Sequence, residues 1–293
     1  MVRFKNNIGP FIKWAGGKQS IADQLLACFP ENINCFYEPF VGGGSVFMAT
    51  EWDNAVISDV NGWLVDTYKA IRDDWERVAE ILDTMPNEKS FFLELRSKHA
   101  SFHKTQFERA AAFIYLNKTC FRGLFRVNKR GYFNVPYGEY DRRYYDPSNL
   151  RGVSELLGKV EIFQGDFELC LATTNSEDFV YFDPPYYKLG GYSDFNRYTP
   201  DQFKEAQHIR LAALCRELDQ RGIRWAVSNS DTPFTRELFK GFFSTQVKAR
   251  REINLKSEDR NISELLFTNY EIKRPSRIRI QQSELLLSGL SPL

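Results

Sequence analysis

The sequence predicts an α/β fold in which a mostly parallel sheet is flanked by helices and interrupted by a mainly helical insertion. Three observations favour this doubly wound arrangement. Short apolar runs that end at an acidic residue recur along the chain, helical patterns separate them, and a long helical stretch without a strand signal follows residue 61. Acidic residues at the ends of parallel strands should meet at one edge of the sheet, where ligands bind in open α/β folds.

Composition limits the interpretation. A chain of 293 residues with 43% hydrophobic and 26% charged residues can bury a full core, as one large domain or one domain with an insertion. Its net charge of +1 gives no general signal for a polyanion, so nucleic-acid binding has to rest on local clusters. The five cysteines contain no Cys-x-x-Cys pair, which is typical of reduced thiols in a cytoplasmic protein. We expect no metal site, export signal or membrane span.

The first motif is Phe11-Ile12-Lys13-Trp14-Ala15-Gly16-Gly17-Lys18, where two lysines surround a glycine pair before an amphipathic helix that stops at Pro30. A phosphate-binding P-loop is disfavoured on two counts. Ile12 stands where the first glycine of that loop belongs, and Gln19 follows Lys18 where Ser or Thr would hold magnesium.

A glycine corner follows the first predicted strand, residues 35–38. That strand runs into Pro39-Phe40-Val41-Gly42-Gly43-Gly44-Ser45 and then into a helix that we expect to reach about Thr50. Glycine lets the backbone approach a ligand closely, whereas Glu38 disfavours a pyrophosphate and suits an ammonium or hydroxyl groups. The next strand, residues 55–58, ends at Asp59, about twenty residues after Glu38, the spacing at which an acid meets ribose hydroxyls. The corner therefore favours an amino-acid-bearing nucleoside over a dinucleotide.

Helical patterns occupy residues 61–113, and a segment of different character follows at 118–151. The second segment holds eight basic residues against three acids, interleaved with eight aromatic residues and several turn formers. This mixture suits a loop or hairpin that holds phosphates and wedges rings between bases. A solvated charged loop is the alternative.

Two further strands end at acids. After a short helix near residues 154–157, the strand 160–163 leads to Gly165-Asp166-Phe167, and the strand 179–182 ends at Asp183-Pro184-Pro185-Tyr186. The prolines hold the backbone extended and cannot continue a sheet, so they predict a rigid rim of fixed acceptors beside one aromatic face. Such a rim suits a flat ring that carries an amino group. An ordinary strand exit with a capping Asp is the alternative.

The rest of the chain should complete the sheet. Residues 187–198 are polar, glycine-containing and aromatic, which favours a mobile lid. A helix is expected over 200–218, and strands over 223–227, 243–247 and 264–267. The tail, residues 273–293, has no clear period and stays unassigned.

Taken together, these blocks resemble the Dam-type family (D12 class, alpha group) of S-adenosylmethionine-dependent DNA adenine-N6 methyltransferases, over residues 10–271. The matching blocks are the 11–18 motif, the glycine corner, Gly165-Asp166-Phe167, the Asp183 rim and Asn134-Val135-Pro136-Tyr137-Gly138. The resemblance implies a Rossmann-like methyltransferase sheet with an inserted, mainly helical target-recognition domain. The catalytic domain would span 1–60 and 155–272, and the recognition domain would span 61–154.

The resemblance also implies the site residues. Asp183, Pro184, Pro185 and Tyr186 would be catalytic: Asp183 and the Pro184 carbonyl would grip the amine of a flipped adenine, on which Tyr186 stacks. Asp59 would bind the ribose of S-adenosylmethionine, and Asp166 would lie near its adenine amine. The cofactor pocket would be lined by Trp14, Lys18, Glu38, Pro39, Phe40, Gly42, Gly43, Gly44, Asp59, Asp166, Phe167 and Asp183.

DNA contacts follow from members that recognise GATC. In those members a Lys at the position of Lys13 contacts the first guanine, and an Arg at Arg126 reads the guanine paired with the final cytosine. An aromatic residue at Phe121 enters the base stack. The full set implied here is Lys13, Phe121, Arg122, Leu124, Arg126, Asn134, Pro136 and Tyr140, with Leu124 and Pro136 on thymine. Two departures are Arg122, where Asn is common, and Glu139, where Arg often contacts the DNA backbone.

Other activities stay open on the sequence. Cytosine-N4 methyltransferases usually begin the rim with Ser, so Asp183 disfavours them. Methylation of an RNA or protein amine would use the same chemistry, and a catalytically silent DNA-binding relative is a third alternative. The implied partner is double-stranded DNA. A cognate restriction endonuclease that acts on the same site without direct contact also stays open.

Overall fold

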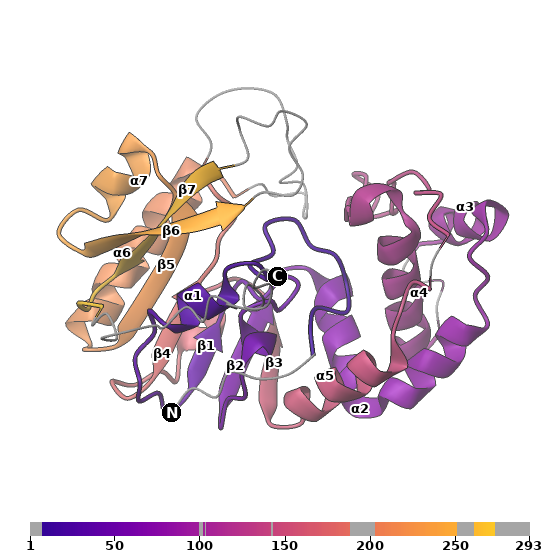
Figure 1. Ribbon diagram of the computed structural model, residues 1–293, viewed down its shortest axis with the longest axis horizontal. Coiled ribbons are helices and arrows are strands. Elements are labelled where there is room, and N and C mark those ends of the chain that lie inside the picture. The colour runs from indigo at the N-terminus through magenta and orange to yellow at the C-terminus, as the bar shows by residue number, and fades with distance from the viewer. Residues whose placement is uncertain are drawn as a thin grey trace, which may run out of the picture.

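The computed structural model describes residues 8–99, 102, 104–141, 143–187, 203–250 and 261–272, and the side chains of 248–250 and 261–263 are outside that description. Within these residues the chain forms a seven-stranded sheet in the order β3-β2-β1-β4-β5-β7-β6 (Figure 1). Neighbouring strands from β3 to β5 are parallel, whereas β7 is antiparallel to both β5 and β6. The strands are β1 (Phe36–Glu38), β2 (Ala55–Asp59), β3 (Val160–Gln164), β4 (Phe179–Phe182), β5 (Arg224–Ser230), β6 (Phe243–Arg250) and β7 (Asn261–Thr268).

The strand order reverses at the pair formed by β1 and β4. Phe36 of β1 pairs with Ala55 of β2 on one side and with Phe179 of β4 on the other. Asp59 at the end of β2 pairs with Gln164 at the end of β3. The carboxyl ends of these strands therefore reach one edge of the sheet, and the reversal creates the crevice in which open α/β folds bind ligands.

Apolar side chains alternate between the two faces of the sheet and build a core on each. On one face Phe36, Ile57 and Phe179 pack with residues of α1 (Ala22–Leu26) and the helical insertion. On the other face Val180 and Val227 pack with residues of α6 (Glu205–Gln220). Burial on both faces explains why the central strands read as continuous apolar runs.

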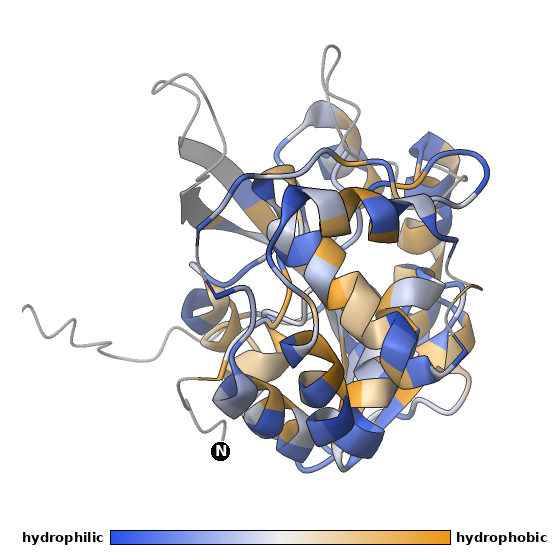
Figure 2. Cartoon of the chain, turned by 90° about the vertical axis from the view of Figure 1, so that its right-hand side faces the viewer, coloured by the Kyte–Doolittle hydropathy of each residue, from blue (hydrophilic) through white to orange (hydrophobic). Residues whose placement is uncertain are grey.

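The helical insertion stands at the β3 side of the sheet. It contains α2 (Gly62–Asp83), α3 (Lys89–Ser97), α4 (Gln106–Thr119) and α5 (Pro147–Leu157). Helix α2 packs against α4 and α5 and also contacts β2 and β3. Figure 2 views the molecule from this side, where hydrophilic and hydrophobic residues alternate along the helices, as expected for helices with one buried face. The expected domain boundary at 154/155 falls inside α5, and the division into domains stays a prediction.

An irregular hairpin connects α4 to α5. Isolated antiparallel bridges join Cys120 to Tyr137 and Val127 to Phe133, and one 3₁₀ turn, η3 (Phe121–Gly123), opens it. We call residues 120–137 the recognition hairpin. The sequence predicted a loop or hairpin here, and the bridges confirm it.

The structure differs from the sequence-based expectations in its short helices. The helix expected to reach Thr50 is one 3₁₀ turn, η1 (Phe47–Ala49), because Thr50 is already extended. Helix α5 begins at Pro147, well before the expected residue 154. Asp146 caps it by accepting a hydrogen bond from the backbone N–H of Ser148, and Pro147 fits its first turn. A short 3₁₀ turn, η4 (Leu169–Leu171), follows β3.

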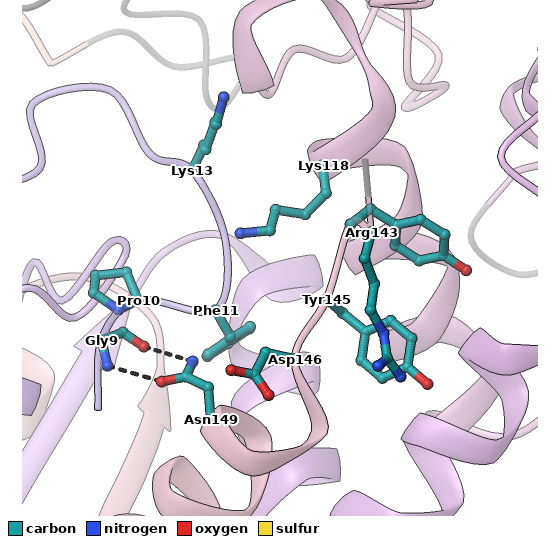
Figure 3. A pocket seen from close by; sticks show the side chains of 10 residues that line it. Gly9, Pro10, Phe11, Lys13, Lys118, Arg143, Tyr145, Asp146 and Asn149 are labelled. Atoms are coloured by element: carbon teal, nitrogen blue, oxygen red, sulfur yellow. Dashed lines mark hydrogen bonds between the residues drawn. The ribbon is translucent and has the colours of Figure 1, made fainter. Parts of the chain in front are cut away.

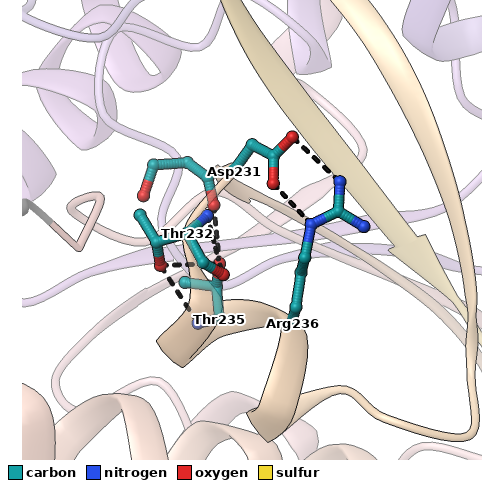
Figure 4. A network of polar contacts seen from close by, with 5 residues as sticks. Asp231, Thr232, Thr235 and Arg236 are labelled. Atoms are coloured by element: carbon teal, nitrogen blue, oxygen red, sulfur yellow. Dashed lines mark hydrogen bonds and ion pairs between the residues drawn. The ribbon is translucent and has the colours of Figure 1, made fainter.

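Helix α7 (Pro233–Leu238) was not expected from the sequence. The Thr232 hydroxyl accepts a hydrogen bond from the Thr235 N–H at 3.1 Å, and Asp231 and Arg236 form a two-pronged ion pair at 2.6 and 2.9 Å (Figure 4). These contacts close a turn that an apolar pattern cannot reveal. The expected lid beyond Tyr187, the first residues of the helix expected over 200–218, and the tail 273–293 lie outside the described residues.

In the described ranges, no helix is long and apolar enough to cross a membrane. The same ranges hold no group of His, Cys, Asp and Glu arranged to bind a metal ion. All five cysteines are free thiols.

Candidate active site

The rim at the end of β4 is held by a buried ion pair. Lys18 Nζ lies 2.8 Å from Asp183 Oδ2 and also donates a hydrogen bond to the Gly16 carbonyl at 2.5 Å. Lys18 is only 4% exposed, so the pair is largely out of water. The second oxygen of the carboxylate, Asp183 Oδ1, is buried and has no hydrogen-bond partner in the described part of the chain. Asp183 therefore keeps one acceptor available.

Tyr186 is fixed by two charged groups. Its hydroxyl donates a hydrogen bond to Glu264 Oε2 at 3.0 Å, and Lys18 Nζ lies 4.7 Å from the centroid of its ring. Glu264 comes from β7 and is buried. The ammonium thus lies over the ring of Tyr186.

The carboxyl groups at this edge hold their protons more tightly than usual. Burial raises the pKa of Asp183 to about 6, the nearby ammonium of Lys18 opposes this rise, and the charge of Glu264 adds to it. Burial and the charge of Asp183 also raise the pKa of Glu38 well above its ordinary value. Glu38 Oε2 is a second buried carboxylate oxygen without a partner among the described residues. The electrostatics of the edge favour a cationic or hydrogen-bond-donating ligand.

The glycine corner is shaped by contacts within the protein. Asp59 Oδ2 accepts a hydrogen bond from the Gly42 N–H at 3.1 Å, and the Tyr68 hydroxyl donates to the Gly42 carbonyl at 2.9 Å. A Cβ at Gly42 would lie 2.7 Å from Trp14 Cδ1, and one at Gly44 would lie 2.7 Å from the Tyr68 hydroxyl. Both glycines have positive φ, 48° and 72°. The approach of these glycines to a ligand stays a prediction, and within the described chain their nearest neighbours are Trp14 and Tyr68.

Each carboxylate oxygen of Asp59 accepts one backbone hydrogen bond. Its Oδ1 accepts the Asn61 N–H at 2.9 Å, while its Oδ2 holds Gly42. Burial raises the pKa of Asp59 to about 6 despite these backbone donors. Asp59 therefore ties the glycine corner to the start of α2, whose N-cap is Asn61.

Asp166 and Phe167 lie at the end of β3 beside α6. The rings of Phe40 and Phe167 stack with centroids 5.3 Å apart. Arg210 of α6 pairs with Asp166 and with Glu168 and lies 4.4 Å from the centroid of Phe167. The edge expected to bind the adenine of the cofactor thus consists of the Phe40–Phe167 pair, next to the carboxylate of Asp166 that Arg210 binds.

The recognition hairpin carries most of the expected DNA contacts. Phe121 is 45% exposed, and the guanidinium of Arg122 lies 5.1 Å from its ring centroid. Arg126 is exposed and donates hydrogen bonds to the side chain and the carbonyl of Asn134, at 2.7 and 3.2 Å. The hairpin presents an aromatic ring and positive charges to solvent, as a nucleic-acid surface requires.

A cleft of about 560 Å³ opens beside Lys13, and Figure 3 shows Lys118 extending from α4 into it. Asn149 closes one end by donating to the Gly9 carbonyl and accepting from the Gly9 N–H, both at 2.9 Å. The cleft is lined by Gly9, Pro10, Phe11, Lys13, Lys118, Arg143, Tyr144, Tyr145, Asp146 and Asn149.

Comparison with known proteins decides the family. The model of the D12 class N6 adenine-specific DNA methyltransferases matches residues 14–253. The chain belongs to this family. The D12 methyltransferase is 41% identical to the type II methyltransferase M.MjaIII of Methanocaldococcus jannaschii, over 90% of this chain and 99% of that protein. It is 37% identical to M1.LlaDCHI of Lactococcus lactis subsp. cremoris, over 91% and 97% of the two chains. It is 33% identical to the DNA adenine methylase of Escherichia coli strain K12, over 87% and 93%.

Among solved structures, the D12 methyltransferase is similar to the rRNA methyltransferase aviRa of Streptomyces viridochromogenes. The identity is 14%, the coverage is 89% of this chain and 90% of that one, and the TM-score is 0.37. That likeness is too slight to carry an argument. The family match establishes that the D12 methyltransferase is an adenine-specific DNA methyltransferase.

The D12 methyltransferase brings the expected site residues together in three groups. Lys18, Asp183 and Tyr186 are in contact, and the charges of Lys18 and Asp183 act on Glu38. The second group contains Trp14, Asp59 and the glycines, and the third contains Phe40, Asp166 and Phe167. Pro39 and Pro184 are buried, and Pro185 is half-buried. Leu124 is half-buried on the recognition hairpin, and the Pro136 carbonyl accepts the Phe121 N–H at 2.8 Å.

Sequence reasoning missed three polar residues of the D12 methyltransferase. Glu264 holds Tyr186, Arg210 holds Asp166, and Asn117 binds the backbone of Lys13. Each acts on a residue far away in the chain, so no local spacing could have revealed it. The one sequence feature that could have indicated such a residue is a polar side chain within an apolar run, as Asn117 is within 110–117.

Proposed function

We propose that this methyltransferase transfers a methyl group from S-adenosylmethionine to N6 of an adenine that is flipped out of duplex DNA, within GATC. The observation that carries the proposal is the half-buried carboxylate of Asp183, whose buried Oδ1 lacks a partner in the described chain, near the ring of Tyr186. An acceptor at a fixed rim and an aromatic surface suit the amine and the plane of adenine respectively.

The residues present fit S-adenosylmethionine, which would supply an electrophilic methyl group. The buried, partner-less Glu38 Oε2 would accept the ammonium of its amino-acid part. Asp59 would meet the ribose hydroxyls, and the Phe40–Phe167 pair with Asp166 would take the adenine. Trp14 and the glycine corner would shape the floor of the pocket.

For the target adenine to bind, the Lys18 side chain has to move away from Asp183 and Tyr186. Its ammonium lies over the Tyr186 ring and pairs with Asp183, so it occupies the place proposed for the flipped base. A base inside the stack cannot reach the methyl group, which is why it must be extruded. Once Lys18 has moved, Asp183 and the Pro184 carbonyl would accept hydrogen bonds from the two N–H groups of N6. Their pull would free the nitrogen lone pair for in-line attack on the methyl carbon. The new N–C bond would form as the S–C bond breaks, S-adenosylhomocysteine would leave, and the extra proton on N6 would be lost to solvent.

GATC recognition rests on the residues of the recognition hairpin and on Lys13. Arg126, anchored by Asn134, would read the guanine paired with the final cytosine. Lys13 would contact the first guanine, Leu124 and Pro136 would touch thymine, and Phe121 would enter the stack. Arg122 and Tyr140 would complete the DNA-binding set. Relatives named type II methyltransferases support a cognate restriction endonuclease that acts on the same site without direct contact. The proposed location is the cytoplasm, where the DNA substrate would lie.

The test is methyl transfer from labelled S-adenosylmethionine to matched duplexes that contain GATC or carry one changed base pair. Transfer to the GATC adenine alone supports both the chemistry and the site. Transfer to other adenines would keep the chemistry and reject GATC. No transfer despite bound cofactor would reject duplex DNA as the acceptor and turn attention to RNA and protein amines.

Arg126→Ala should lower discrimination at the base pair of the final cytosine by about 1–3 kcal/mol, because a two-pronged arginine contact to guanine would be lost. The measurement is the ratio of single-turnover rates on the two duplexes that differ at that pair. Arg130→Ala, an exposed arginine of the same hairpin, is the control. An unchanged ratio in Arg126→Ala would remove Arg126 from base reading.

A further inference from the structure

A single buried amide joins two DNA-facing parts of the chain. Asn117 lies near the end of α4 and is fully buried. Its Oδ1 accepts the backbone N–H of Lys13 at 2.8 Å, and its Nδ2 donates to the Lys13 carbonyl at 2.9 Å and to the Gly123 carbonyl at 3.2 Å. Both backbone groups of Lys13 are thus bound by one side chain, which also holds the recognition hairpin.

Further contacts join Lys13 to the residues around the Asn117 amide. Gly123 has φ 65°, and a Cβ there would lie 2.3 Å from Lys13 Cδ, so the hairpin backbone packs directly on the Lys13 side chain. Lys13 Nζ lies 5.3 Å from the ring centroid of Tyr140, whose hydroxyl accepts the Arg122 N–H at 2.8 Å. The position of Lys13 is therefore defined relative to the hairpin from several directions.

The same short segment reaches the catalytic rim. Trp14, next to Lys13, packs on Gly42 and Gly43 of the glycine corner, and Lys18 pairs with Asp183. Lys18 follows Lys13 by five residues in this segment. A displacement of Lys13 relative to the hairpin would therefore be transmitted through Lys18 to Asp183. Losing the amide would also leave two backbone groups of Lys13 without their partner, and buried backbone groups are seldom left so.

We propose that Asn117 is a positioning residue that sets sequence discrimination at the base pair contacted by Lys13, by fixing Lys13 in register with the recognition hairpin. This inference rests on the proposed function. It differs from a purely structural role for the amide, which would lower stability without affecting one base pair more than another. The pair formed by Arg126 and Asn134 is internal to the hairpin and moves with it, so a shift of the hairpin against Lys13 should leave discrimination at the final pair in place.

The experiment compares Asn117→Ala with Thr119→Val, a control that removes another buried polar group from the same helix. The Thr119 hydroxyl donates to the Tyr115 carbonyl at 2.7 Å, one turn back in the same helix. Single-turnover methylation is measured on GATC duplexes and on duplexes changed at the first or the last pair. Asn117→Ala should lose about tenfold in discrimination at the first pair and keep discrimination at the last, whereas Thr119→Val should keep both.

A double-mutant cycle with Lys13→Ala separates positioning from general destabilisation. If Asn117 acts through Lys13, Asn117→Ala causes no further loss at the first pair once Lys13 is Ala. Additive losses, or equal losses at both pairs, overturn the proposal. If Asn117→Ala does not fold, Asn117→Asp is used, which keeps the acceptor for the Lys13 N–H and removes both donors. A wild-type protein without activity on GATC would instead reject the proposed function, which keeps the two failures distinct.

Discussion

At the level of single residues, the site is governed by buried carboxyl groups around the ammonium of Lys18. That ammonium pairs with Asp183 and lowers the pKa of both Glu38 and Asp183, while burial raises both values. Glu264 adds a further negative charge and holds Tyr186. This cluster of carboxyl groups favours the binding of a cation or of amine N–H donors. The protonation of these carboxyl groups should therefore control turnover near neutral pH.

Asp183→Ala should keep the fold and lose turnover by about a hundredfold or more, because one preorganised acceptor for the amine disappears. Single-turnover methylation gives the rate, and calorimetric binding of S-adenosylmethionine together with circular dichroism reports whether the pocket and fold persist. Glu161→Ala, a substitution on the exposed side of β3, is the control. Near-normal turnover in Asp183→Ala would reject the proposed chemistry.

Turnover should fall as the pH drops through about 6, since the pKa of the proposed acceptor Asp183 is about 6 and protonation removes its negative charge and one acceptor site. Glu264→Gln removes a charge that raises this pKa, so the falling limb of the pH–rate profile should move to lower pH.

The raised pKa also means that Asp183 binds its proton more tightly in the folded chain. Its stabilising contribution is therefore present below the unfolded value of 3.8 and is lost as the pH rises through about 6.

The matched control for that profile is Glu161→Gln, which removes an exposed negative charge from β3. A limb that stays in place in Glu264→Gln, or that moves equally in both variants, would contradict the assignment to Asp183. Tyr186→Phe keeps the ring and removes the hydroxyl that holds Glu264, so it separates the charge of Glu264 from its hydrogen bond.

At the level of elements, the recognition hairpin and the residues just after it contain unusual backbone conformations. Arg122 has φ 60° and Glu139 has φ 53°, both in the left-handed region that Asn and Gly adopt more easily. These are the two positions at which the chain departs from the Dam-type pattern. The preference for Asn at the position of Arg122 thus has a conformational explanation, independent of any contact with DNA.

Arg122→Asn should raise the free energy of unfolding by about 1 kcal/mol or less, because Asn adopts positive φ at lower cost than Arg. Thermal and urea unfolding give this value. Arg130→Asn is the control on the same hairpin, since Arg130 is exposed and is not among the residues with positive φ. Equal or opposite changes in the two variants would show that backbone conformation at residue 122 does not limit stability.

At the level of the whole molecule, the site is assembled from β1, β2, β4 and β7 together with the 11–18 segment. A ligand that bridges these parts should stabilise all of them. S-adenosylmethionine at about a hundred times its dissociation constant should raise the free energy of unfolding by about 2.7 kcal/mol. Glu38→Gln should lose most of that gain, since the buried carboxylate proposed for the ammonium is removed. Thermal unfolding with and without cofactor measures both values, and an equal gain in Glu38→Gln would reject that role.

The sequence predicted the strands well and the polar links between them poorly. The strands were predictable because buried apolar runs end abruptly, as Phe179–Phe182 does before Asp183 and the two prolines. The contact between Lys18 and Asp183 needed the fold, although both residues were expected in the cofactor pocket. Glu264, Arg210 and Asn117 could not be predicted, because their partners are distant in sequence and nothing local marks them. Helix α7 and the start of α5 at Pro147 depend on side-chain caps, which the spacing of apolar residues in the sequence does not reveal.

The antiparallel strand β7 has a consequence for the order in which the site can form. Glu264, which holds the Tyr186 hydroxyl, lies 78 residues after it in the chain. Synthesis proceeds from the amino end, so the glycine corner, the insertion and the rim all leave the ribosome before their last anchor exists. A nascent chain therefore cannot hold Tyr186 in its final place until β7 has emerged and paired between β5 and β6. The hydrogen bond between Tyr186 and Glu264 is thus withheld from the polypeptide until nearly the whole described fold has been made.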